Sequence, residues 1–113
     1  MSDASGAYLH ESLQQGRKDD TGKPMWHLVP LPPMEAVVRV LTKGAARYGE
    51  NNWMFVPGAR NRYYDAALRH INDWYMGATA DDGPKGDGEP HLAHAICCLL
   101  FLMHFDEQKE VAG

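Results

Sequence analysis

The chain has 113 residues and a mass of 12.6 kDa, which suits one small domain and leaves no room for two. Its composition, with 44% hydrophobic and 23% charged residues, is that of an ordinary globular protein. The formal net charge of −4 argues against a protein that coats nucleic acid through a net positive field, so we expect no stable nucleic-acid complex.

The chain shows no sign of secretion or membrane insertion. Residues 1–16 are polar and carry no apolar core of a signal peptide. The most apolar stretch, residues 92–105, is too short to span a bilayer. Cys97 and Cys98 are neighbours in this stretch, and neighbours on a helix cannot form a disulfide with each other. We therefore expect reduced core cysteines in a cytoplasmic protein without a membrane partner.

The chain divides into an arm, a single helical domain and a tail. Residues 1–22 are mostly polar and predict a flexible N-terminal arm, in which a short helix over 7–15 would be marginal alone. Residues 23–109 predict one helical domain, which begins with an extended, proline-rich segment up to Pro30. Residues 110–113 are expected to form a tail, after a polar stretch from Asp106 that is expected to fray.

Three helices are expected within the domain. The first begins at Pro33 or Met34 and ends at Gly49, and its apolar stripe consists of Met34, Val37, Val38, Leu41, Ala45 and Tyr48. The second spans about 61–76 and the third about 90–109. The third is apolar at nearly every position from 92 to 105, which predicts a central helix buried on most sides. Without any strand pattern, the prediction is an all-α bundle of three to four helices with an extended N-terminal arm.

Apolar surface without an evident cover predicts self-association. A monomer of three helices covers about two faces of the third helix, and the loop at 50–59 adds Trp53, Met54 and Phe55. This loop is expected to fold back over the core or into a partner subunit. The helix before the loop contains Gly44, which suggests a close approach by a neighbour or a ligand. Because exposed apolar groups are costly, we expect a symmetric homo-oligomer, a dimer or a multiple of one.

Histidines and aspartates form one candidate site on the second and third helices. His70 and Asp73 are three residues apart, as are His91 and His94, so each pair shares a helix face. Imidazole and carboxylate groups are the usual ligands of divalent transition metals. The catalytic and metal-binding residues expected here are His70, Asp73, His91 and His94, with Asp87 as a further ligand and Asp81 and Asp82 in the same loop. Taken singly, each histidine equally fits a packed core residue bonded to backbone or to Asp73.

Cationic, glycine and aromatic residues form a second candidate site. Glycines let backbone N–H groups approach phosphate, lysine and arginine supply charge, and aromatic rings stack on a base. The residues expected to bind substrate are Lys23, Trp26, Lys43, Arg47, Tyr48, Asn52, Trp53 and Arg69. Arginines on helices often belong to a solvated face, which is the alternative for each of them alone.

The order of these motifs is similar to that of a known family. The matching segments are Asp20-Thr21-Gly22-Lys23-Pro24, Lys43-Gly44-Ala45, Tyr48-Gly49, Asn52-Trp53, Ala67-Leu68-Arg69-His70 and His91-Leu92-Ala93-His94-Ala95. Over about residues 18–105 the chain resembles the phage dATP/dGTP diphosphohydrolase N-terminal domain family. The resemblance implies a phage-encoded helical domain in the host cytoplasm, linked to purine deoxynucleotides. In the enzymes that name the family, dATP and dGTP lose pyrophosphate and become monophosphates.

Three functions remain open at this point. The first is a purine deoxynucleotide phosphohydrolase assisted by a divalent ion (Mg, Mn or Co), acting alone or with catalytic groups that a partner region supplies. The second is a nucleotide-binding protein without catalysis, which sequesters a nucleotide or a nucleotide signal. The third is a purely structural or interaction role.

Overall fold

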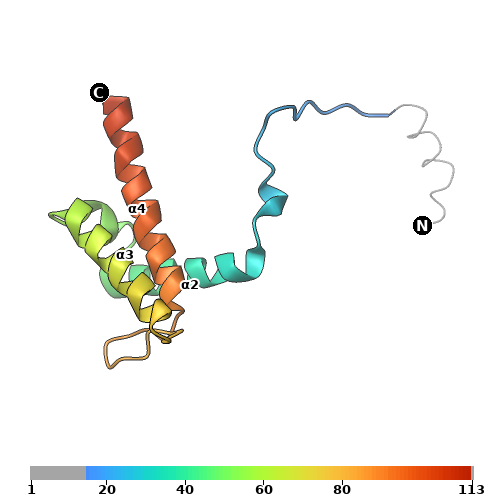
Figure 1. Ribbon diagram of the computed structural model, residues 1–113. Helices are drawn as coiled ribbons and strands as arrows, with labels where there is room; N and C mark the ends of the chain where they lie inside the picture. The colour runs from blue at the N-terminus through green and yellow to red at the C-terminus, as the bar shows by residue number, and fades with distance from the viewer. Residues whose placement is uncertain (1–14, 113) are drawn as a thin grey trace, which may run out of the picture.

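The computed structural model describes residues 15–112 (Figure 1). The helix expected over 7–15 lies almost wholly outside these residues. The described elements are a 3-10 helix η1 (Trp26–Leu28), helix α2 (Leu31–Tyr48), a second 3-10 helix η2 (Asn52–Phe55), α3 (Ala59–Tyr75) and α4 (His91–Ala112). Between residues 15 and 112 no strand forms, and Ala80 and Pro90 make an isolated bridge. The predicted all-α class is confirmed.

Prolines and glycines set the helix ends close to the expected positions. Helix α2 begins at Leu31, and its first turn contains prolines, whose missing N–H groups have no helical acceptor there. It ends before Gly49, whose N–H donates to the Ala45 carbonyl over 2.8 Å. Helix α4 continues to Ala112, so the stretch from Asp106 and the predicted tail are helical as far as that residue.

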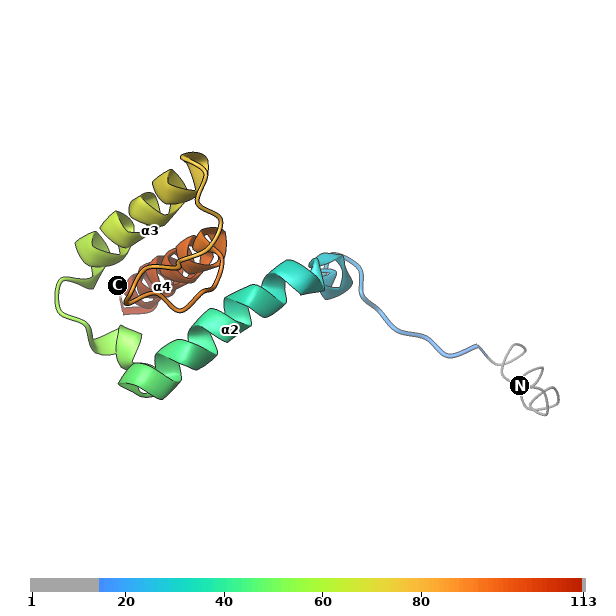
Figure 2. The same ribbon diagram turned by 90° about the horizontal axis from the view of Figure 1, so that it is seen from below.

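The helices meet through small side chains. Helices α3 and α4 run side by side, whereas α2 crosses α4 (Figures 1 and 2). Ala36 and Val37 of α2 are buried against Ala93 and Cys97 of α4. The Cys97 thiol donates a weak hydrogen bond to the Val37 carbonyl over 3.6 Å. Cys97 and Cys98 are free and buried, as expected.

The apolar stripe predicted for α2 is only partly buried. Val37 lies in the core, but Val38 is 53% exposed and Tyr48 is also exposed. Adjacent positions of a helix point about 100° apart, so Val38 faces away from the contact that buries Val37. Tyr48 is exposed because α2 crosses α4 instead of lying along it, so its last turn leaves the core. Helix α4 likewise differs from the expectation of burial on most sides, because its outer face remains exposed.

The segment before α2 leads away from the three helices (Figure 2). The extended conformation expected up to Pro30 is interrupted by η1, in which Val29 N–H donates to the Trp26 carbonyl over 3.0 Å. The packed helical body therefore begins at Leu31, eight residues after the predicted domain boundary. None of the described helices is long and apolar enough to cross a membrane.

Backbone hydrogen bonds and ion pairs to α2 hold the loop between α3 and α4, although its Gly, Asp and Pro residues predict flexibility. His91 N–H donates to the Thr79 carbonyl, and Asp81 N–H donates to the Glu89 carbonyl, each over 2.9 Å. The buried carboxylate of Glu89 accepts from Arg39 Nε at 3.0 Å and pairs with Lys43 Nζ at 2.7 Å. These two cations lie on α2, so they fix the loop against that helix.

Candidate functional site

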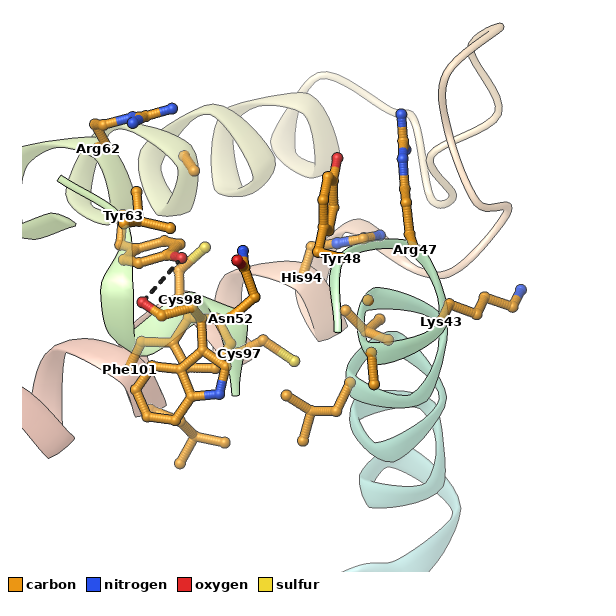
Figure 3. A pocket seen from close by; sticks show the side chains of 18 of the residues that line it. Lys43, Arg47, Tyr48, Asn52, Arg62, Tyr63, His94, Cys97, Cys98 and Phe101 are labelled. Carbon is orange, nitrogen blue, oxygen red and sulfur yellow. Dashed lines mark hydrogen bonds between the residues drawn. The ribbon is translucent and has the colours of Figure 1, made fainter. Parts of the chain in front are cut away.

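A broad cleft of about 1280 Å³ opens between the C-terminal half of α2, η2, α3 and the inner face of α4 (Figure 3). Cys97, Cys98 and Phe101 of α4 lie along its floor. Tyr48 and Asn52 project from the segment that joins α2 to η2. Ligand sites combine an apolar lining with a few placed polar groups, and this cleft has both.

An aromatic cluster supports the floor of the cleft. The Trp53 ring stacks on Phe101 with centroids 4.3 Å apart and an angle of 11°. His104 and Phe105 meet the same indole edge-on. The 50–59 loop thus folds back over the core through Trp53, whereas Phe55 of the same loop is 79% exposed. One face of Trp53 is thereby used within the protein, so the exposed ring of Tyr48 is the freer surface for a base.

Cationic side chains line the cleft together with the carboxylates of Glu50, Asp65, Asp81 and Asp87. The cations Arg47, Arg62, Arg69 and Lys85 form no ion pair with a carboxylate among residues 15–109, whose side chains the structure describes. Arg47 and Arg62 rise from opposite sides of the floor in Figure 3. Arg47 lies 5.1 Å from the centre of the Tyr48 ring, and Arg62 Nη1 donates to the Pro57 carbonyl over 3.2 Å. Unpaired guanidinium groups around a concave surface suit an anionic ligand.

Lys43 has a different environment from these cations. Its ammonium group pairs with Glu89 and also donates to the Asp87 carbonyl over 2.8 Å. Together with Arg39 it holds the pKa of the Glu89 carboxyl below its usual range. In Figure 3 the Lys43 side chain points away from the floor of the cleft. Lys43 thus lines the cleft while its charge is engaged in fixing the loop.

The predicted histidine and aspartate site is divided into two groups, of which the first faces the cleft. His94 Nε2 lies 2.8 Å from Asp87 Oδ1 and 3.9 Å from Asp81 Oδ2. Asp87 Oδ1 also accepts from Glu89 N–H over 2.9 Å. Partial burial opposes ionisation of Asp87, but the bonds from His94 and Glu89 outweigh it and hold its pKa below the usual value.

The second group adjoins the first, with His70 at the cleft and His91 and Asp73 behind the lining. The His70 ring stacks on His94 with centroids 4.6 Å apart, and its Nδ1 lies 2.9 Å from Nδ1 of the buried His91. One of these two imidazoles donates the hydrogen bond and the other accepts it. Asp73 Oδ2 is 4.0 Å from His91 Nδ1. Burial, followed by the neighbouring His94 and His91, lowers the pKa of His70.

The first group contains the residues that could hold a small cation. Ligand atoms of Asp81, Asp87 and His94 all lie within 4.8 Å of one another. Two atoms that ligate one ion at about 2.0–2.2 Å are at most about 4.4 Å apart, so these side chains would have to move slightly closer together to share one. A cation there would take the place of the proton between His94 and Asp87. His70 Nδ1 is already bonded to His91, so these two residues and Asp73 form a separate network.

The structure brings most of the predicted site residues together. Those at the cleft are Lys43, Arg47, Tyr48, Asn52, Trp53, Arg69, His70, Asp87 and His94. Lys23 and Trp26 lie on the segment before α2, and they do not line the cleft of their own chain. His91 and Asp73 stand behind the lining.

The cleft also contains Arg62, Tyr63 and Lys85, which are not among the eight residues expected to bind substrate, although Arg62 belongs to the same set of cationic residues in the sequence. Arg62 precedes Arg69 by seven residues, which is two helical turns, so the shared face was visible in the sequence. Lys85 offered no such signal because its loop position follows no period. Tyr63 donates from its hydroxyl to the Trp53 carbonyl over 3.4 Å, a contact between segments that spacing does not reveal.

Comparison with known proteins agrees with the resemblance seen in the motifs. Residues 13–112 match the family described as "dATP/dGTP diphosphohydrolase, N-terminal". The chain is 35% identical, over 88 residues, to a dATP/dGTP diphosphohydrolase of Salmonella phage PMBT28. This alignment covers 77% of the chain but 28% of that relative's length. No solved structure matches. Since the family match spans nearly every residue, the chain belongs to the dATP/dGTP diphosphohydrolase N-terminal family.

Proposed function

We propose that the cleft binds a purine deoxynucleoside triphosphate and takes part in its hydrolysis to the monophosphate and pyrophosphate. The observation that carries the proposal is the unpaired positive charge of Arg47, Arg62, Arg69 and Lys85 around one cleft that also contains the His94–Asp87 pair. A triphosphate is the kind of anion that several such groups bind together. The family and the phage relative supply the purine specificity and the reaction.

In this proposal some side chains of the cleft bind the phosphates and others bind the base. The arginines would hold the phosphates, and the exposed Tyr48 ring would stack on the base. The Asn52 side-chain amide beside Tyr48 offers both a donor and an acceptor to the edge of a purine. Gly44 lines the cleft without a side chain, which leaves room for the ligand next to α2.

The acid–base and metal chemistry is assigned to the group that faces the cleft. Asp81, Asp87 and His94 would hold a divalent cation such as Mg²⁺, Mn²⁺ or Co²⁺. When bound, it would polarise a phosphoryl oxygen and lower the pKa of a bound water. His70 and His91 would keep the His94 ring in place through stacking and hydrogen bonding. In the overall reaction, water adds to the α-phosphorus and pyrophosphate leaves.

A second candidate is nucleotide binding without catalysis. It is favoured by the completeness of the hydrogen bonding: within the described residues no buried side-chain nitrogen or oxygen lacks a partner. Asp87 and His94 already hydrogen-bond to each other, so neither side chain requires an ion as its partner. In that role the arginines would retain a nucleotide or nucleotide signal, and the histidines would hydrogen-bond to it.

Incubation with dATP, dGTP, dCTP and dTTP, with and without each metal, separates the two candidates. Hydrolysis predicts purine monophosphate and pyrophosphate in anion-exchange chromatography, whereas sequestration predicts intact nucleotide after heat denaturation of the protein. Asp87→Asn should lower turnover by about 100-fold or more, as expected when an acid–base or metal-binding group is lost. Asp106→Asn, on exposed α4 surface outside the cleft, is the matched control. Turnover that Asp87→Asn and His94→Gln both leave unchanged would remove this group from the reaction.

A further inference from the structure

We infer that a second copy of this chain covers the outer face of α4 in a two-fold dimer. In this dimer the segment Met25–Leu31 of each protomer packs against the other protomer. This inference is independent of the proposed reaction, because the outer face of α4 does not line the cleft, apart from Leu100 at its edge. It rests on two exposed apolar surfaces that a single chain leaves without cover.

The first surface is a seam along α4. Leu92, Ile96, Leu99 and Met103 recur at steps of four, three and four residues, and each is exposed. Helices α3 and α4 pack together, and α2 crosses α4 on another side, so the seam lies on the side that neither helix covers (Figure 1). A repeat of 3.5 residues keeps an apolar seam facing a partner helix. The seam therefore has the spacing that suits a helix of the same kind.

The second surface is the segment before α2. Trp26 is 81% exposed, and Met25, Leu28 and Leu31 are exposed with it. Their backbone is ordered by η1 and by the first turn of α2, so the apolar groups are displayed from fixed positions. The segment leads away from α3 and α4 in both views (Figures 1 and 2). It does not cover the α4 seam of its own chain.

Charge and area both favour a copy of the same chain as the occupant. Residues 90–105 contain no Asp, Glu, Lys or Arg, so two seams can meet without bringing like charges together. The eight exposed side chains of the seam and the segment offer an area on the order of 900 Å², and each partner in a standard interface buries about 800 Å². In a symmetric dimer each protomer buries both its α4 seam and its Met25–Leu31 segment against the other protomer.

Analytical ultracentrifugation of the full chain across a micromolar dilution series tests the inference. The wild type should sediment as a species of at least twice the 12.6 kDa chain mass. Leu99→Asp should give monomers, and Trp26→Ser should raise the dissociation constant about tenfold or more, as for an aromatic group at the centre of an interface. Both residues are exposed, so circular dichroism should show unchanged helix content in both variants.

Tyr75→Asp provides the matched control on α3, at a position that is as exposed as the arm. It should leave the assembly intact. A wild-type monomer, an assembly that Leu99→Asp does not dissociate, or dissociation by Tyr75→Asp would overturn the inference. So would a monomer that instead sediments with phosphatidylcholine vesicles, because the seam would then face lipid. An unchanged dissociation constant in Trp26→Ser would contradict the role given to the segment.

Discussion

His70 has the environment that most affects how the cleft responds to pH. Its ring lies between two other imidazoles, stacked on His94 and hydrogen-bonded to His91. A proton on His70 would be desolvated and would face any charge carried by its neighbours. These effects lower its pKa, while Asp81 and Asp73 oppose the shift only in part. The neutral form of His70 is therefore the form that the fold favours.

The lowered pKa of His70 predicts a loss of stability in mild acid. As the pH falls below the ordinary histidine value of about 6.5, the unfolded chain takes up a proton before the folded chain does. The free energy of unfolding should decline until the pH passes the folded pKa and then cease to depend on this group. Urea unfolding between pH 8 and pH 5, roughly the range over which histidine titrates, measures how the free energy of unfolding depends on pH. His70→Gln should flatten this part of the profile.

His27→Gln is the matched control, because His27 is exposed on η1 and far from the cluster. Its profile should follow that of the wild type. Equal pH slopes in His70→Gln and the wild type would show that His70 titrates alike in the folded and unfolded chains.

Lys43 shows why a residue's role cannot be assigned from its type alone. In the sequence it stands next to Gly44, and this pair predicts a phosphate contact. In the structure its nearest anion is Glu89, 46 residues away along the chain, and the ion pair fixes the loop that carries Asp87. Nothing in the local pattern indicates which cation pairs with the buried carboxylate. The arginines without such a partner were identifiable only after folding.

Gly44 lies within α2 and Gly49 directly follows its last residue, and the two glycines have different structural roles. Gly49 adopts φ 97° and ψ 150°, a conformation that other residues avoid. Gly44 is within the helix, and a Cβ at this position would meet no protein atom within 4 Å. The close neighbour expected at Gly44 is thus absent from the described part of the chain, whereas the cleft lies beside it.

Alanine substitutions at these glycines should have opposite effects. Gly44→Ala should raise the free energy of unfolding by about 0.5–1 kcal/mol through helix propensity, yet weaken nucleotide binding by narrowing the cleft. Gly49→Ala should lower the free energy of unfolding by about 1–3 kcal/mol, because its backbone conformation would be strained. Chemical denaturation measures both. A Gly44→Ala variant that is more stable and binds as tightly as the wild type would contradict the assignment of a ligand to this side of α2.

Helix positions were predictable, and helix packing was predictable only in part. Proline at the start of α2, Gly49 after its end and the apolar period are local features, so they indicated each helix to within a few residues. The way α2 crosses α4 depends on the surfaces of both helices, so the local pattern of either helix does not predict it. It left Tyr48 exposed at the cleft, although Tyr48 belongs to the same periodic stripe as Val37.

The candidate site depends on the whole molecule, because four segments contribute to it. Arg47 comes from α2, Asn52 from η2, Arg62 from α3 and His94 from α4. The sequence identified many of the contributing residue types and placed them in one domain. It could not show that His70 hydrogen-bonds to His91 while His94 pairs with Asp87, since both pairs had the same spacing. Lys23 and Trp26 remain predictions for substrate binding, and the segment that carries them is the one that we expect to reach a second copy.

Calorimetric titration of the full chain with dGTP tests most directly whether the arginines of the cleft bind a purine deoxynucleoside triphosphate. We expect saturable binding to the wild type, an affinity about tenfold lower in Arg62→Ala, as for the loss of one charged hydrogen bond, and wild-type affinity in Arg60→Ala. These two arginines are two residues apart on α3, and only Arg62 lines the cleft. Absence of binding, or equal weakening by both substitutions, would contradict the account.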